Sequence, residues 1–223
     1  MEKQIVKIID TFFITHDVKS FIVERPGNFQ FEPGQATELA IYKKGWKDEK
    51  RPFTFTNLPG DEFLQFIIKT YPAHKGMTNE LLKAEKGDKL IMGEVFGTIK
   101  YQGRGTFIAG GAGITPFIAI LRNLKKTGEL FGNKLIFANK KWEDIILEKE
   151  FKGLLGDNFI NILSEEKRKG YHYGLIREDF LKSHIAGSTG KFYVCGPPPM
   201  MDAILDQLSG LGIPDEAVIK EEF

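Results

Sequence analysis

One connection in the second half of the chain most restricts what this sequence can fold into. Phe107-Ile-Ala109 has the composition of a buried strand, and Gly110-Gly-Ala-Gly-Ile-Thr-Pro116 follows it directly. Thr115 can cap the next helix, and Pro116 suits the first helical position, where a missing N–H costs nothing. An apolar helical face then follows at Phe117, Ile118, Leu121 and Leu124. We therefore expect a strand, a glycine turn and a helix, the connection typical of a parallel sheet.

This glycine turn has two interpretations. Bare backbone N–H groups between the carboxyl end of a strand and the N-terminus of a helix can receive a nucleotide pyrophosphate. A glycine turn can also simply tighten a β–α connection, and for a lone glycine loop that is the commoner case. The pattern differs from the G-x-G-x-x-G dinucleotide fingerprint, so we infer nothing from that motif.

The two halves of the chain follow different sequence patterns. Up to about residue 100, short β-rich runs alternate with turn sequences, at 18–24, 36–42, 53–56, 63–70 and 89–92, with one helix near 78–85. From about residue 104, strand-like runs at 106–109, 134–138, 159–163 and 191–195 alternate with helix-like stretches at 116–126, 142–155, 177–183 and 200–209. We predict two domains: an antiparallel β-barrel over residues 1–100 and an α/β parallel sheet, with helices on both faces, over residues 104–223.

Composition narrows the class of protein. The 223 residues suit two domains of about 100–120 residues each. With 31 Lys and Arg against 30 Asp and Glu, the charge does not call for nucleic acid or an anionic membrane as partner. We see no signal-peptide core and no apolar stretch near the ~18–20 residues of a membrane span. One cysteine excludes an internal disulfide and a four-cysteine iron–sulfur cluster, and the four histidines are scattered, so we expect a cytoplasmic protein without a metal.

Two segments of the first half have a polar pattern that chemistry could use. In Arg51-Pro-Phe-Thr-Phe-Thr56 the aromatic rings should lie on one face of a strand and the hydroxyls on the other. Such a strand could stack a flat heterocyclic ring, with Arg51 beside a phosphate, although an ordinary amphipathic strand explains it equally well. Gly76-Met77-Thr78 opens the expected helix, with Thr78 as its cap, and the helix end could hold a phosphate. A simple capped helix is the alternative.

The last segment is a proline-rich turn. Phe192-Tyr-Val-Cys195 resembles a buried parallel strand, and Gly196 and three prolines should prevent a helix before Met200. A buried, unpaired cysteine is most often a small hydrophobic residue.

In this order, segments 51–56, 110–116 and Cys195-Gly-Pro-Pro-Pro-Met200 resemble the ferredoxin–NADP reductase family, and Phe31-Glu-Pro-Gly-Gln35 resembles its Phe-x-Pro-Gly-Gln turn. The resemblance covers nearly the whole chain. It implies an oxidoreductase with FAD on the first domain and NAD(P)H on the second. Hydride would pass to the flavin, and electrons would pass to a separate carrier such as ferredoxin, flavodoxin or a free flavin. A flavin-bearing subunit or sensor without independent turnover stays open as an alternative, as does a free-flavin reductase.

The resemblance also implies roles for single residues. In the first domain, Arg51 would meet the flavin pyrophosphate and the Thr54 hydroxyl the flavin N5, within the motif Arg51, Pro52, Phe53 and Thr54. The remaining flavin contacts would come from Ile67, Lys69, Gly76, Met77 and Thr78, and the last three favour FAD over FMN.

In the second domain, the nucleotide's pyrophosphate and ribose would contact Gly111, Gly113 and Thr115. Cys195 would lie near the nicotinamide, in a positioning role, together with Gly196, Pro197 and Met200. Glu221 and Phe223 match a family ending in Glu-x-Tyr, in which the aromatic residue covers the flavin; Phe223 filling an edge is the alternative. The expected catalytic residues are thus Thr54, Cys195 and Glu221. The loops at 138–141 and 164–168 carry both lysines and glutamates, and they do not decide between NADH and NADPH.

Overall fold

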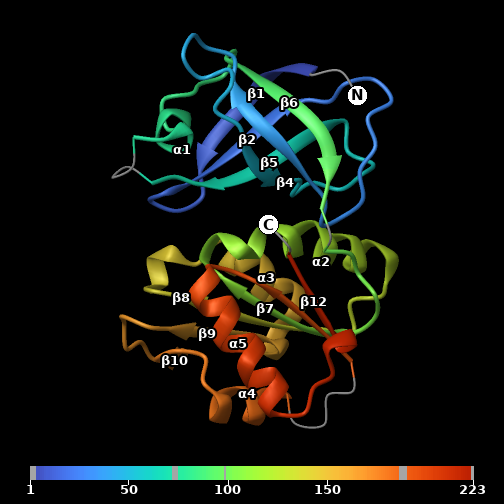
Figure 1. The fold of residues 1–223 in the computed structure, drawn as a ribbon, viewed down its shortest axis with the longest axis vertical. Coiled ribbons are helices and arrows are strands. Elements are labelled where there is room, and N and C mark those ends of the chain that lie inside the picture. The colour runs from blue at the N-terminus through green and yellow to red at the C-terminus, as the bar shows by residue number, and fades with distance from the viewer. Residues whose placement is uncertain (1–3, 72–74, 98, 186–189, 222–223) are drawn as a thin grey trace. The chain divides into compact units, whose positions relative to one another are not determined.

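The computed structural model describes residues 4–71, 75–97, 99–185 and 190–221. The chain divides into two compact units, and Figure 1 shows its elements. The first unit comprises residues 1–98 and 115–123, and the second comprises residues 99–114 and 124–223. The helix α2 (Thr115–Thr127) therefore contributes residues to both units.

The first unit is built on one six-stranded antiparallel sheet, in the order β4-β3-β6-β1-β2-β5. Just beyond β4, the Thr56 N–H donates to the Gln65 carbonyl of β5 (2.9 Å), so the two outer strands of this order meet and the sheet curls toward a barrel. The strands are β1 (Gln4–Phe13), β2 (Val18–Glu24), β3 (Ala36–Ile41), β4 (Arg51–Thr54), β5 (Phe63–Lys69) and β6 (Lys89–Phe96).

Aromatic side chains fill the core of this unit. Phe55 is fully buried, its ring stacks on that of Phe31 (4.4 Å between centroids), and Phe66 lies 5.1 Å away. The strand β1 is absent from the predicted set. Ile5 and Ile9 are exposed on one of its faces while Val6 and Ile8 are buried on the other, so apolar residues on both faces hide the alternation that identifies a strand.

The second unit is a six-stranded parallel sheet in the order β10-β9-β8-β7-β11-β12. Strand order reverses between β7 and β11, which pair directly with Ala109 opposite Cys195. Ligands of such sheets bind beyond the carboxyl ends of the strands at this reversal. The strands are β7 (Gly105–Gly110), β8 (Lys134–Asn139), β9 (Phe159–Leu163), β10 (His172–Tyr173), β11 (Lys191–Cys195) and β12 (Val218–Lys220). The predicted fold class, antiparallel then parallel, is confirmed; the domain limits 1–100 and 104–223 stay a prediction.

The helices begin at other residues than predicted. The stretch 142–155 is not one helix: Leu147 has φ +54°, and the α-helix begins only after it. The last helix begins at Pro198 rather than Met200, because prolines fit a first helical turn, whose N–H groups have no partner within the helix. The helices are α1 (Met77–Leu81), α3 (Glu148–Leu155), α4 (Glu178–Ile185) and α5 (Pro198–Gly210). Across the described ranges, no helix combines the length and apolarity needed to cross a bilayer.

Candidate functional site

The glycine connection after β7 needs its glycines for two different reasons. Gly111 has φ +50°, a left-handed conformation, and a Cβ there would meet open space. A Cβ on Gly113 would lie 2.3 Å from the Cys195 carbonyl oxygen, so only glycine allows the end of β11 to pass this closely. Gly111 thus leaves room for a ligand, whereas Gly113 is explained by packing alone.

The helix after this turn is capped differently from the prediction. A 3₁₀ turn, η1 (Gly111–Ile114), leads directly into α2, so Ile114 is the N-cap and Thr115 the first helical residue. The predicted cap at Thr115 and the predicted first position of Pro116 are each wrong by one residue. Thr115 nevertheless remains on the first turn, where backbone N–H groups point away from the helix.

The proline-rich turn after β11 packs against the end of β7. A Cβ on Gly110 would lie 2.2 Å from the Met200 sulfur, and one on Gly196 would lie 3.1 Å from the same sulfur and 3.3 Å from the Gly110 nitrogen. Pro197 is the N-cap of α5. The structure therefore brings together Gly196, Pro197 and Met200 with the glycine connection, as a ligand site at the strand reversal requires.

Cys195 and Glu221 form a buried pair in the second unit. The thiol lies 3.2 Å from the Glu221 carboxylate oxygen Oε2 and is 4% exposed. Burial, and then the neighbouring Glu221 charge, raise the pKa of the Cys195 thiol far above its usual range. Burial also raises the pKa of the Glu221 carboxyl, although the hydrogen bond from the thiol opposes this. Two of the three expected catalytic residues are thus in contact, while Phe223 lies outside the described residues.

The strand β4 separates rings from hydroxyls as predicted. Phe55 lies in the core and Phe53 packs against it, so strand alternation directs Thr54, which is 8% exposed, to the other face. The Arg51 guanidinium is exposed, donates to the Lys50 carbonyl (2.6 Å) and lies 3.6 Å from the Glu49 carboxylate. Pro52, the residue after Arg51, is also exposed. A cation at a strand end and a buried hydroxyl suit a phosphate and a polar ring edge, respectively.

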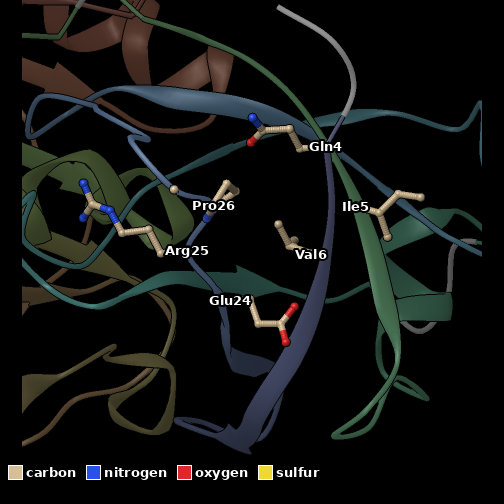
Figure 2. Close-up of a pocket in the computed structure, with 7 residues that line it drawn as sticks. Gln4, Ile5, Val6, Glu24, Arg25 and Pro26 are labelled. Carbon is tan, nitrogen blue, oxygen red and sulfur yellow. The ribbon is translucent and has the colours of Figure 1, made fainter.

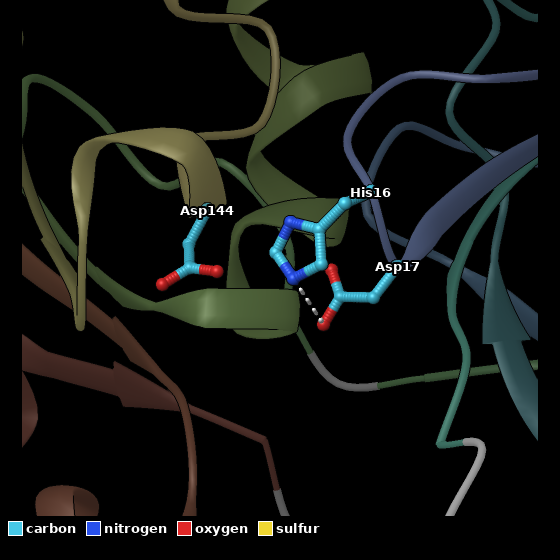
Figure 3. A group of neighbouring side chains, drawn as sticks. All are labelled: His16, Asp17 and Asp144. Atoms are coloured by element: carbon cyan, nitrogen blue, oxygen red, sulfur yellow. Dashed lines mark ion pairs between the residues drawn. The ribbon is translucent and has the colours of Figure 1, made fainter.

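On β5, the Lys69 ammonium is already paired. Its Nζ lies 2.8 Å from Asp17 Oδ2, and His16 Nε2 lies 3.7 Å from the same carboxylate oxygen, as the dashed line in Figure 3 marks. A phosphate would therefore compete with Asp17 for Lys69. Ile67, on the same strand, is 3% exposed and lies outside the main core cluster, which contains its neighbours Phe66 and Ile68, so strand alternation places it on the opposite face of β5.

The helix α1 begins earlier than predicted at the expected phosphate-binding segment 76–78. Gly76 is the N-cap of α1 and Thr78 is its second residue, so the predicted cap at Thr78 is wrong. The Met77 side chain is 1% exposed and belongs to the core, which leaves only its backbone for a cofactor. The helix has five residues because the next turns close with the 3₁₀ hydrogen bonds Leu82 N–H to Asn79 and Lys83 N–H to Glu80.

A hollow of ≈ 550 Å³ lies in the first unit between the start of β1 and the end of β2 (Figure 2). It contains no predicted site residue. Arg25, on its wall, uses its guanidinium to donate to the backbone carbonyls of Phe29, Pro59 and Asp61, so its charge holds loops together.

Asn139, the last residue of β8, is not among the site residues predicted from the sequence. The residue is 8% exposed, and neither its Oδ1 nor its Nδ2 has a hydrogen-bond partner. An asparagine between an alanine and two lysines resembles ordinary loop chemistry, so no sequence signal reveals that this amide is buried.

Comparisons with known proteins agree with this geometry. Residues 107–206 match the oxidoreductase NAD-binding domain family. The reductase component of propane 2-monooxygenase from Mycolicibacterium goodii is 27% identical over 94% of this chain and 64% of its own length. NADH-cytochrome b5 reductase 2 from Mycosarcoma maydis is 31% identical over 85% of this chain and 60% of its own length. The chain therefore spans about three fifths of these relatives.

A solved structure shares the fold. The ferredoxin NADP+ reductase from Neisseria gonorrhoeae, with bound FAD and NADP, superposes with a TM-score of 0.83 at 19% identity, over 95% of this chain and 92% of the other. At that identity the likeness establishes the fold alone.

Proposed function

We propose that this chain belongs with the ferredoxin–NADP reductase family, as its three motifs predict, and that it is an FAD-dependent NAD(P)H oxidoreductase that passes electrons to a separate carrier. The observation that carries the proposal is the group of residues at the strand reversal of the second unit. There the glycine connection and the proline-rich turn meet, and the Cys195–Glu221 pair lies at the end of β11. This is where parallel sheets of this kind bind nucleotides.

The residues of the second unit fit a dinucleotide. Gly111 provides open backbone at the carboxyl end of β7, where an anionic pyrophosphate could approach the N–H groups of the glycine connection. Gly196 and Pro197 would border the nicotinamide end. Burial raises the pKa values of both Cys195 and Glu221, so the nicotinamide end would meet a buried thiol–carboxyl pair.

The residues of the first unit fit a flavin dinucleotide. Arg51 would pair with its diphosphate, the backbone N–H groups of 76–78 would support it, and Ile67 would contact the ring. Thr54, whose side chain is buried, would hydrogen-bond the polar edge of the ring. Bound FAD would supply the redox chemistry, accepting hydride from NAD(P)H and releasing electrons one at a time.

The visible spectrum of the purified protein tests this proposal. We expect a yellow protein that bleaches on anaerobic addition of NADH or NADPH. The nucleotide that bleaches it faster is the preferred electron donor. A colourless protein that takes up no FAD from solution contradicts the proposed function.

The acceptor is proposed by class. The relatives are a reductase component of a monooxygenase and a cytochrome b5 reductase, which supports a separate redox protein as the acceptor. We therefore expect stopped-flow reoxidation by oxidised ferredoxin, flavodoxin or cytochrome b5. Rapid reduction of free FMN by NAD(P)H, without any of these carriers, would instead favour a flavin reductase. Reduction of the bound flavin without reoxidation by any acceptor would favour a flavin-bearing subunit. A cytoplasmic location stays a prediction, which cell fractionation tests.

A further inference from the structure

Asn139 is the one residue, within the part of the chain that the structure describes, whose two side-chain polar atoms are both buried and both lack a partner. An amide offers two N–H donors and one carbonyl acceptor. Leaving such a group buried and unbonded destabilises a protein, so native buried polar groups nearly always have partners. A group of this kind points to a partner that the polypeptide itself does not provide.

The register of the sheet places Asn139 beside the glycine connection. Ile136 and Ala138 of β8 pack on the side of the sheet that α4 and α5 cover, so alternation directs Asn139 to the opposite side. Phe137, two residues before Asn139, lies on that side too, and residues paired across neighbouring strands point to the same side. Because Phe137 pairs with Ala109 and Ala109 pairs with Cys195, the Cys195 side chain also lies on this side of the sheet. At the next position, Gly110 pairs with Ala138, and β8 contacts η1.

Asn139 also stands at the end of its strand. It pairs with Leu163, the last residue of β9, and its backbone carbonyl accepts the Ser164 N–H (3.0 Å). Both strands therefore end level with the turn that begins at Gly111. The amide is within the layer of strand ends where a ligand of a parallel sheet binds.

We propose that Asn139 is a nucleotide-positioning residue whose amide hydrogen-bonds the ribose–diphosphate part of the nicotinamide nucleotide. Ribose hydroxyls can accept from Nδ2 and donate to Oδ1, and phosphate oxygens can accept from Nδ2. The inference rests on the proposed function, because it assumes that a dinucleotide binds this unit. It adds a residue that none of the recognised motifs contains.

Asn161 provides a matched control on the neighbouring strand. It lies on the same side of the sheet but pairs with Phe137, two residues further from the strand ends, and its Oδ1 is buried without a partner. A change at Asn161 alters a similar amide away from the glycine connection. We expect it to leave nucleotide affinity within about twofold.

The test measures binding of ADP-ribose, NAD+ and NADP+ to the full-length protein by isothermal titration calorimetry, with the melting temperature of the nucleotide-free protein as a second readout. In Asn139→Leu, we expect the Kd for ADP-ribose to rise about tenfold or more, since a ligand hydrogen bond is lost. The nucleotide-free Tm should be unchanged or higher, because two unbonded polar atoms are removed. Asn139→Ala, which adds no atoms, repeats the measurement if the leucine side chain does not fit.

Each outcome decides between the possibilities. A raised Kd with an undiminished Tm, and an unaffected Asn161→Leu, supports the proposal. An unchanged Kd in a folded Asn139 variant overturns this inference and leaves the proposed function intact, because the amide then binds buried water. If the unaltered protein binds none of the three nucleotides, the proposed function fails and this inference fails with it.

Discussion

At the scale of single residues, the one cysteine of the chain lies beside a carboxyl group and not beside a base. Reactive cysteines have lowered pKa values and partial exposure, because the thiolate is the nucleophile. Cys195 has the opposite environment, since it is 4% exposed and burial raises its pKa. This supports the prediction that Cys195 positions a ligand by packing and does not attack it.

We expect Cys195 of the folded protein to react with Ellman's reagent at pH 8 at least ~100-fold more slowly than the same cysteine in urea. The reason is that both burial and the raised pKa suppress the thiolate. The absorbance of the released thiol measures the rate, and the urea sample serves as the control for full reactivity. Complete labelling of the folded protein within seconds would refute the packing role.

Glu221 should make stability depend on pH. The folded state raises the pKa of this carboxyl, so the folded protein binds its proton more tightly than the unfolded chain does. The contribution is therefore favourable at low pH, and it is lost as pH rises from about 4.3, the ordinary value, through the higher folded value. In Glu221→Gln we expect the free energy of unfolding, measured in urea from pH 5 to pH 8, to fall less with pH. Glu216→Gln, at an exposed position, should retain the full dependence.

At the scale of elements, the glycine connection after β7 is the least tolerant of change. In Gly113→Ala, the new Cβ would meet the Cys195 backbone at 2.3 Å, and neither strand can move without breaking the β7–β11 pairing. We expect the free energy of unfolding to fall by about 3 kcal/mol, the upper range for overpacked sites.

The same substitution elsewhere in the second unit should have the opposite sign. Gly153 lies within α3, and its Cβ would meet open space. Gly153→Ala should therefore stabilise the protein by about 0.5–1 kcal/mol, since alanine has less conformational freedom to lose. Urea titrations of both variants check the pair of values, and equal effects would contradict the packing argument.

The ends of three strands were easier to predict than the ends of the helices. Strands 18–24, 159–163 and 191–195 are observed with the predicted limits, because each is a continuous β-rich run bounded by turn residues. The helix expected from 142 was wrong because Leu147 adopts a left-handed conformation that leucine seldom takes, and nothing in its neighbourhood along the chain indicates it.

At the scale of the whole molecule, α2 follows the glycine connection, and its residues up to 123 belong to the first unit. Arg122 on this helix donates from Nη1 to the Thr56 carbonyl (2.7 Å) and to Gln65 Oε1 (3.0 Å). Gln65 in turn donates to the Ser20 hydroxyl (3.1 Å), so the guanidinium completes a network of partly buried polar groups in the first unit.

We expect Arg122→Met to lower the free energy of unfolding by about 2 kcal/mol, because hydrogen bonds from a charged donor are lost and their acceptors remain. Arg177→Met, at an exposed position, is the matched control and should change stability by less than about 0.5 kcal/mol. Urea unfolding compares the two variants. Faster amide exchange at Thr56 and Gln65 in Arg122→Met, but not in Arg177→Met, would place the loss of stability at this network. Equal stability of the two variants would exclude the network as a stabilising feature.

The sequence by itself determined the two-part architecture, the order of the three motifs and the strand that carries Thr54, because periodicity, turn residues and glycine placement act over a few neighbouring residues. Only the tertiary structure decided that Cys195 contacts Glu221 and that the Asn139 amide is buried without a partner. It also decided that Asp17 pairs with Lys69. These features arise where strands that are distant in the chain pair with one another. That pairing decides which side chains are buried and which charged groups are neighbours, and the local sequence does not contain this information.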